Sequence, residues 1–240
     1  MIKHLKPSLL DQQYLSVRAY VVATPIGADF SKLIVTKPWG YEYLLLQHPI
    51  SEVWHLNIKH NQSTSMHCHP NKKTALVVLE GKALFSSLHE SMELDPLDAV
   101  VIHAGTFHST QAISLEDATV LELETPPMKH DLVRLEDKYG RAMSGYENID
   151  KMTTNGHHVR LSTDELGLKR KIGDNTLSVC NVKSLSDLSS LKAGKSIAIL
   201  LSGTIESGLG ETIFEAGDML TEPLRADCVC KNLAVLSITR

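Results

Sequence analysis

The sequence predicts an all-β fold organised as a barrel, and three observations lead to this expectation. Gly, Pro, Asn and Asp divide the 240-residue chain into short apolar runs rich in Val, Ile and Leu, as is typical of strands joined by turns. Two of these runs, within residues 65–81 and 98–108, adjoin closely spaced histidines. The outline of this region recurs near residues 197–221, which indicates two β units in tandem.

The N-terminal arm, residues 1–36, is expected to supply strands. Its runs YLSVRAYVVATPI and FSKLIVTK are rich in β-branched and aromatic residues and are split at Pro25-Ile26-Gly27. Because the second unit is short for a barrel, the arm is a candidate to complete the sheet of that unit. Residues 53–59, VWHLNIK, then form a further strand that leads through a polar turn to the first histidines.

His67 and His69 lie two residues apart, so a β-strand would place both imidazoles on one face. His108 follows the second apolar run in a G-x-x-H sequence, and an antiparallel neighbouring strand would bring it beside them. Three histidines on two strands favour a divalent metal: zinc first, with iron(II), manganese or nickel as alternatives. Cys68, between the two histidines, would point away from them into the core.

The two histidine segments resemble the paired motifs of the cupin superfamily, small jelly-roll barrels also called double-stranded β-helices. In that family a glutamate usually follows the H-x-H pair by five positions, and here that position is Thr74. The second motif carries His103 where proline is usual. With these departures, the resemblance implies a site of three histidines, with water or substrate in the remaining coordination positions.

Two further stretches resemble the cupin domain of type II mannose-6-phosphate isomerases. KPWGYEYLLL, residues 37–46, is similar to the start of that domain, and DLVRLEDKYGR, residues 131–141, is similar to its end. The resemblance implies that Arg134 and Arg141 bind an oxyanion or phosphate, since a guanidinium fork suits either. Pairing of these arginines with the neighbouring acidic residues of the same stretch is the alternative.

The second unit resembles the first without its histidines. IAILLSGTIE, residues 197–206, matches ALVVLEGKAL, residues 75–84. Aligning the glycines of these stretches places Ser189 and Leu191 at the H-x-H positions, and Cys228 takes the place of the third histidine. This unit is therefore expected to be a barrel without a metal site.

The expected architecture is a bicupin. Residues 1–150 would form the metal-binding cupin domain, and residues 151–240 a degenerate cupin-like domain. A net charge of −4 and the absence of Lys and Arg runs argue against nucleic acid or anionic membranes as partners. No apolar stretch approaches the length of a membrane span, no signal core is evident, and the four cysteines show no C-x-x-C pairing, so we expect a cytoplasmic protein.

The resemblance implies a metal-dependent isomerase acting on a sugar or sugar phosphate, and a homodimer is a further expectation. A non-catalytic sugar-binding or regulatory bicupin is one alternative, favoured by the missing glutamate. A three-histidine iron(II) dioxygenase is the other, because a neutral site with open positions also suits oxygen chemistry. The sequence does not choose among these three.

Isomerisation needs a general base, for which the sequence offers Lys73, Glu124 and His103. Lys72 and Lys73 either hold an anionic sugar or belong to a surface loop. Glu122 and Glu124 share one face of the strand expected at residues 118–124, and that face is expected to be solvated. Arg141 would hold the anionic group of the sugar or the enediolate.

Overall fold

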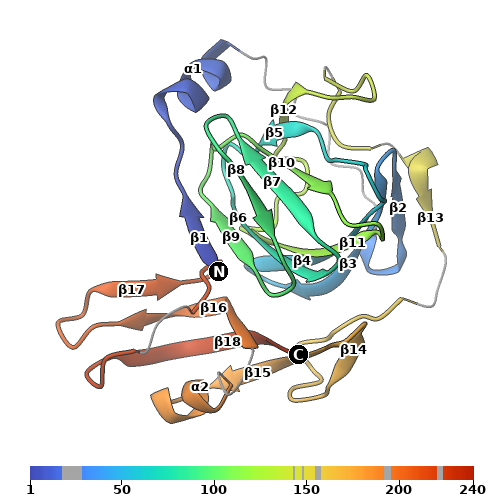
Figure 1. The fold of residues 1–240 in the computed structure, drawn as a ribbon. Coiled ribbons are helices and arrows are strands. Elements are labelled where there is room, and N and C mark those ends of the chain that lie inside the picture. Colours follow the sequence, from blue (N-terminus) through green and yellow to red (C-terminus); the bar gives the residue numbers. More distant parts are fainter. Residues whose placement is uncertain (18–28, 143, 148, 155–157, 192–195, 221–223) are drawn as a thin grey trace.

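The computed structural model describes residues 1–17, 29–142, 144–147, 149–154, 158–191, 196–220 and 224–240. Strands dominate these residues (Figure 1). The helices among them are α1 (Leu9–Val17), α2 (Leu185–Leu191) and the single-turn 3-10 helices η1 (Phe30–Lys32) and η2 (Ile149–Lys151). Within the described residues, no helix has the length and apolar character needed to cross a membrane.

Two sheets form the barrel. The larger has eight strands in the order β1 (Ile2–Leu5), β9 (Ala99–Ile102), β6 (Lys73–Glu80), β11 (Ala118–Thr125), β4 (Ser51–Ile58), β3 (Gly40–His48), β2 (Ile34–Lys37) and β13 (Met152–Thr153). The smaller has five strands in the order β12 (Val133–Glu136), β5 (Met66–Cys68), β10 (His108–Ala112), β7 (Ala83–Ser87) and β8 (Ser91–Leu94).

From β4 to β12 the chain crosses repeatedly between these two sheets. β4, β6, β9 and β11 belong to the larger sheet, whereas β5, β7, β8, β10 and β12 belong to the smaller one. This alternation is the double-stranded β-helix, the jelly roll of cupin barrels, so the predicted all-β barrel is confirmed. Trp54, Leu76, Phe85 and Val120 pack between the sheets.

Gly81 marks one of these crossings. The consecutive strands β6 and β7 do not pair as a hairpin around it: β6 pairs with β9 and β11, while β7 pairs with β8 and β10. Gly81 has a φ of +72°, and a Cβ there would lie 2.6 Å from the carbonyl oxygen of Asp117. Glycine at this position therefore lets the chain turn tightly from one sheet to the other.

The described strands of the N-terminal arm join the barrel. β1 pairs in parallel with β9, and β2 pairs with β3, so they extend the larger sheet at or near its two ends. The expectation that the arm completes the sheet of the second unit is thereby corrected. Residues 9–17 form α1 instead of the start of a strand, because Ser8 and Asp11 cap each other's backbone at its first turn. Pro25-Ile26-Gly27 lies outside the described residues.

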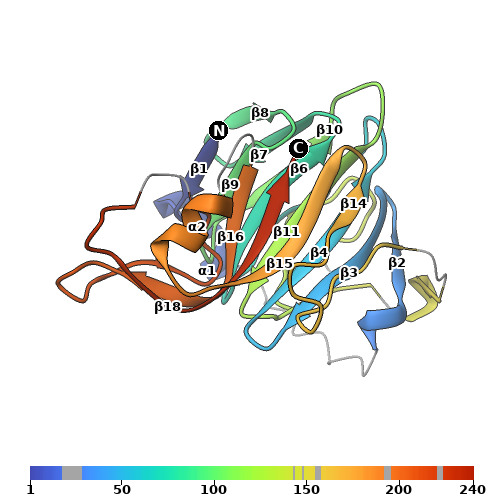
Figure 2. The same ribbon diagram turned by 90° about the horizontal axis from the view of Figure 1, so that it is seen from below.

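The C-terminal segment forms a third sheet. Its strands are ordered β14 (Arg170–Ile172), β15 (Asn175–Val182), β18 (Val229–Thr239), β16 (Ser196–Glu206) and β17 (Thr212–Glu215). Figures 1 and 2 show this sheet lying against the outside of the larger barrel sheet. Leu177 and Leu236 pack there against Leu121 and Leu123 of β11, and α2 covers the opposite face.

This arrangement differs from the expected degenerate barrel. In the described part of residues 158–240 the strands form one open sheet, and the partner layer of that sheet is the barrel itself. An exposed apolar sheet face must be covered by another layer, and the outer face of the larger sheet supplies it. The division into domains at residue 150 stays a prediction.

Candidate metal centre

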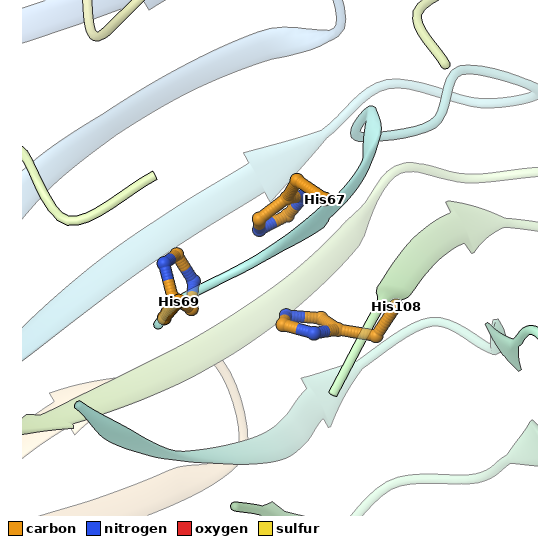
Figure 3. Close-up of side chains that lie close together, drawn as sticks. All are labelled: His67, His69 and His108. Atoms are coloured by element: carbon orange, nitrogen blue, oxygen red, sulfur yellow. The ribbon is translucent and has the colours of Figure 1, made fainter. Parts of the chain in front are cut away.

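The three predicted histidines converge. His67 on β5 lies directly opposite His108 on β10 in the antiparallel pairing, and His69 follows the end of β5 (Figure 3). Ring centroids are 4.5 Å apart for His67 and His108 and 4.9 Å apart for His67 and His69. One nitrogen from each ring lies within 4.8 Å of the others. The strand spacing therefore produced the cluster that it predicted.

Backbone carbonyls orient all three rings. Nδ1 lies 2.8 Å from the Ser65 oxygen for His67, 2.6 Å from the Asp131 oxygen for His69, and 3.0 Å from the Thr106 oxygen for His108. A carbonyl oxygen only accepts, so each Nδ1 carries the hydrogen and each Nε2 keeps a bare lone pair. Metal-binding imidazoles are commonly fixed in this way by a bond from the second nitrogen.

The environment favours the neutral form of His67 and His108. Transfer out of bulk water lowers the pKa of His67 well below its ordinary value, and repulsion from the other two imidazoles adds to this effect. The same transfer, with repulsion from His69, lowers the pKa of His108 to about 4. Nε2 of His69 is buried and has no hydrogen-bond partner in the part of the chain that the structure describes. Three imidazoles that direct Nδ1 at carbonyl oxygens and can offer Nε2 are a donor set that fits a divalent transition metal.

The histidines face a cavity of about 60 Å³ inside the barrel. Its wall carries an unusual number of charged side chains from both sheets and from the segment after β12. The cations are Lys37, Lys72, Lys129, Arg134 and Arg141, and the carboxylates are Glu42, Glu122 and Glu124. Buried charges are costly unless paired, and ion pairs connect most of these groups.

Glu124 forms two of these ion pairs, one with each of two lysines. Lys72 Nζ lies 2.9 Å from Glu124 Oε2, and Lys129 Nζ lies 3.1 Å from Glu124 Oε1. Burial alone would raise the pKa of Glu124, but the ammonium groups of Lys129 and Lys72 hold it below its ordinary value. Glu124 is therefore a carboxylate in the interior of the barrel, next to a protonated lysine.

The expected orientation of Glu122 and Glu124 was wrong. Both side chains point into the barrel, and Glu124 is fully buried. Their strand, β11, is covered on both faces, since Leu121 and Leu123 pack outward against the C-terminal sheet. The polar face of β11 is thus the inner one, and the sequence of this strand carried no signal that its outer face would be covered.

Two of the suggested bases do not line the cavity. Lys73 lies one residue out of phase with the inner face, and its ammonium pairs with Asp218 at 2.9 Å and Glu215 at 3.2 Å. His103 follows β9 and lies near His4, where its backbone N–H bonds the Leu5 oxygen. Both suggestions are therefore corrected. Lys72, one position earlier, supplies the buried ammonium instead.

Both predicted arginines line the cavity, and both are engaged by the chain itself. Arg141 contacts Asp137 through Nη2 at 2.7 Å and Glu147 through Nη1 at 2.5 Å. Arg134 donates to the carbonyl oxygens of Ser144 and Gly145 and lies 3.5 Å from Glu147. The alternative of local pairing holds for Arg141 and Asp137. Glu147 was missed, because no motif marks it.

The positions aligned with the histidines in the second unit have other surroundings. Ser189 and Leu191 lie on α2, and Cys228 is a buried free thiol just before β18. Cys68 is also buried and packs with Phe107 in a small cluster, as expected for a core residue. That the second unit binds no metal stays a prediction.

No protein-family model matches the sequence, and no curated protein matches it. Among solved structures, the chain is similar to KdgF from Halomonas sp., at 19% identity over 38% of this chain and 84% of that one, with a TM-score of 0.36.

Two further solved structures are similar to parts of the chain. A protein with a double-stranded β-helix domain from Klebsiella pneumoniae is 16% identical over 48% of this chain and 100% of that one, with a TM-score of 0.39. A cupin 2 domain-containing protein from Halorhodospira halophila is 16% identical over 39% of this chain and 74% of that one, with a TM-score of 0.34. At this level of similarity no activity follows, and the cupin fold of the barrel rests on its strand order.

Proposed function

We propose that this protein is a metal-dependent isomerase that interconverts the aldose and ketose forms of a small sugar or sugar phosphate. The observation that supports it best is the placement of the Glu124–Lys72 pair, 2.9 Å apart, on the wall of the cavity that His67, His69 and His108 also line. Such a site combines a metal-binding donor set with a base and an acid. Simple binding of a sugar would need neither.

His67, His69 and His108 would hold the metal. When bound, the metal supplies a Lewis acid that polarises the two adjacent oxygens of the sugar. The backbone bonds to the Nδ1 atoms keep the three imidazoles fixed, so the site does not have to reorganise when substrate enters.

Glu124 and Lys72 would move the proton. Isomerisation takes a proton from one carbon and returns it to the neighbouring carbon, so a single carboxylate can serve both steps. Glu124 is ionised because the charges of Lys129 and Lys72 outweigh the effect of burial on its pKa, so its carboxylate is in the form that a base requires. The Lys72 ammonium would donate a hydrogen bond to the substrate oxygen on which negative charge develops. Arg141, on the same wall, would orient the anionic end of the substrate.

Proton exchange at the second carbon tests the reaction. The metal-loaded protein is incubated in deuterated water with a panel of aldoses, ketoses and their phosphates, and NMR follows loss of the C2 proton. We expect exchange in at least one panel member, and its loss in Glu124→Gln. Binding without exchange in any member would replace this proposal with the sugar-binding alternative. Metal-dependent oxygen uptake without exchange would replace it with the dioxygenase alternative.

A further inference from the structure

We propose that Glu122 is a fourth protein ligand of the metal and binds through Oε1 beside the three imidazoles. The inference rests on the metal site of the proposed function and not on the isomerase reaction. It also revises the donor set implied by the sequence, in which Thr74 left no carboxylate near the histidines.

The first argument is that two hydrogen-bond acceptors, one on Glu122 and one on His69, lie close together in the buried site. Oε1 of Glu122 lies 3.6 Å from Nε2 of His69. Nδ1 of His69 directs its hydrogen at the Asp131 oxygen, which leaves Nε2 as the nitrogen that offers a lone pair to a metal. Among the described residues, no group forms a hydrogen bond with this buried Nε2. A metal ion beside both atoms would compensate the carboxylate oxygen and the nitrogen lone pair in this buried site.

The separation of these atoms is the second argument. Protein nitrogen and oxygen ligands lie about 2.0–2.2 Å from zinc, so two ligands at a tetrahedral angle are about 3.4 Å apart. In octahedral geometry, adjacent ligands would be about 3.0 Å apart. The 3.6 Å between Glu122 Oε1 and His69 Nε2 is longer than either separation, and it places the two atoms near the spacing of two ligands on one ion.

Charge compensation is the third argument. Glu124 has ammonium groups at 2.9 and 3.1 Å, and Glu42 has them at 3.1 and 3.3 Å. The nearest lysine nitrogen to Glu122 is that of Lys129, at 4.0 Å from Oε2. Of these three carboxylates, Glu122 is the one left with the weakest cation contact. Its two oxygens face different groups, Oε2 towards Lys129 and Oε1 towards His69.

The position of Glu122 in the sheet agrees with this role. On β11 it lies opposite Leu76 of β6, on the inner face of the barrel, where it points at the cluster formed by β5 and β10. Glu122 on the larger sheet therefore presents Oε1 to the histidine cluster carried by the smaller sheet.

A site of three histidines and one carboxylate limits which metals can be catalytic. An ion that takes six ligands, such as manganese(II), iron(II) or nickel(II), keeps two positions for the two substrate oxygens. A four-coordinate zinc ion would be saturated by the protein. The donor set thus favours a six-coordinate metal over the zinc expected from the histidines alone.

Metal affinity of matched variants tests the assignment. Metal-free wild type, Glu122→Gln, Glu124→Gln and His108→Ala are titrated with manganese(II) against a competing chelator. We expect Glu122→Gln to weaken binding roughly a hundredfold, close to the effect of His108→Ala, and Glu124→Gln to weaken it less than about tenfold. Wild-type affinity in Glu122→Gln would overturn the proposal and leave a three-histidine site intact. Circular dichroism establishes that each metal-free variant is folded.

A second measurement needs no variant. Wild-type crystals soaked in manganese(II) locate the ion by anomalous diffraction. We expect an oxygen of Glu122 within about 2.3 Å of the ion, and a distance beyond about 3 Å would refute the proposal. These results are independent of catalysis: a bound ion ligated by Glu122 without proton exchange would remove the isomerase function and leave the ligand assignment in place.

Discussion

The chemistry of individual side chains in this site depends on the hydrogen bonds and ion pairs that they make with the surrounding chain. The three histidines were predicted from spacing alone, because strand alternation fixes which side chains share a face. Their tautomers depend on the carbonyl oxygens of Ser65, Thr106 and Asp131, which no sequence motif announces. Glu147 was likewise unpredictable, because its partners Lys37 and Arg141 meet it only in the folded chain.

Arg141 should act mainly on substrate binding. It lies in the cavity wall with Asp137 and Glu147, so its loss removes a positive charge that an anionic sugar would share. In Arg141→Ala we expect KM for sugar phosphates to rise about 10- to 100-fold with kcat changed less than about threefold, since such an anchor binds ground and transition states alike. Steady-state kinetics on phosphorylated and neutral sugars measures this. A fall in kcat with unchanged KM would contradict the role.

His55 should make stability depend on pH. It is buried on the outer face of β4, stacked on Tyr43 with centroids 4.6 Å apart. Burial, with repulsion from His158, lowers its pKa to about 4. In the unfolded chain, this imidazole binds a proton near pH 6.5. The free energy of unfolding therefore has its full value above that pH and falls by up to about 3 kcal/mol as the pH drops to 4.

Replacing His55 isolates its contribution to this slope. In His55→Phe, urea unfolding between pH 4 and 7 should show a smaller loss of stability than in wild type. His89→Phe, at an exposed position, serves as the control and should keep the wild-type slope. Equal slopes in wild type and His55→Phe would show that His55 is not the group responsible.

At the level of strands, the predictions depended on which face of the sheet, inner or outer, each side chain occupies. β6 and β11 were correctly expected as strands, yet Lys73 was assigned to the site and Glu122 to the solvent. Both errors have one cause: the larger sheet is covered on both faces, so its strands lack the apolar–polar alternation that identifies an inner face. In β11, the outer Leu121 and Leu123 are as buried as core residues.

Variants of Lys72 and Lys73 test whether Lys72 points into the barrel and Lys73 away from it. Lys72→Met removes the partner of a buried carboxylate and should cost about 3 kcal/mol of unfolding free energy, together with most of the turnover. Lys73→Met breaks ion pairs with Asp218 and the largely exposed Glu215 outside the cavity, so it should cost less than Lys72→Met and leave turnover near wild type. Urea unfolding measures the change in unfolding free energy for both variants, and steady-state kinetics measures their turnover. Equal effects at the two positions would refute the assigned faces.

The whole molecule is organised as a barrel and an outer sheet that share a core. The sequence pattern repeated in residues 197–221 correctly predicted that this region forms β-strands. A local pattern does not reveal whether those strands form one open sheet or close into a barrel. Leu177 and Leu236 belong to the same cluster as Val77 and Leu123 of the barrel. Asn175 also donates a hydrogen bond to the Leu79 carbonyl oxygen across this contact. We therefore expect barrel and outer sheet to unfold together.

Leu236→Ala tests this shared core. The change leaves a cavity at a fully buried position and should cost about 2–5 kcal/mol. Trp39 and Trp54, the two tryptophans of the chain, both lie in the barrel, so their fluorescence reports barrel unfolding. We expect its urea midpoint to fall in Leu236→Ala and to stay unchanged in Leu209→Ala, at an exposed position. An unchanged midpoint in Leu236→Ala would favour two independent domains divided near residue 150.

The most direct test of the account is the metal content of the wild type and of two histidine variants. After loading with a divalent metal and removal of unbound ions, wild type should carry one equivalent, measured by mass spectrometry. His108→Ala should carry almost none, because it loses one of the three converging imidazoles. His103→Ala should retain one equivalent, since that ring lies outside the cavity. A full equivalent in His108→Ala, or none in wild type, would contradict the metal site on which the proposed chemistry depends.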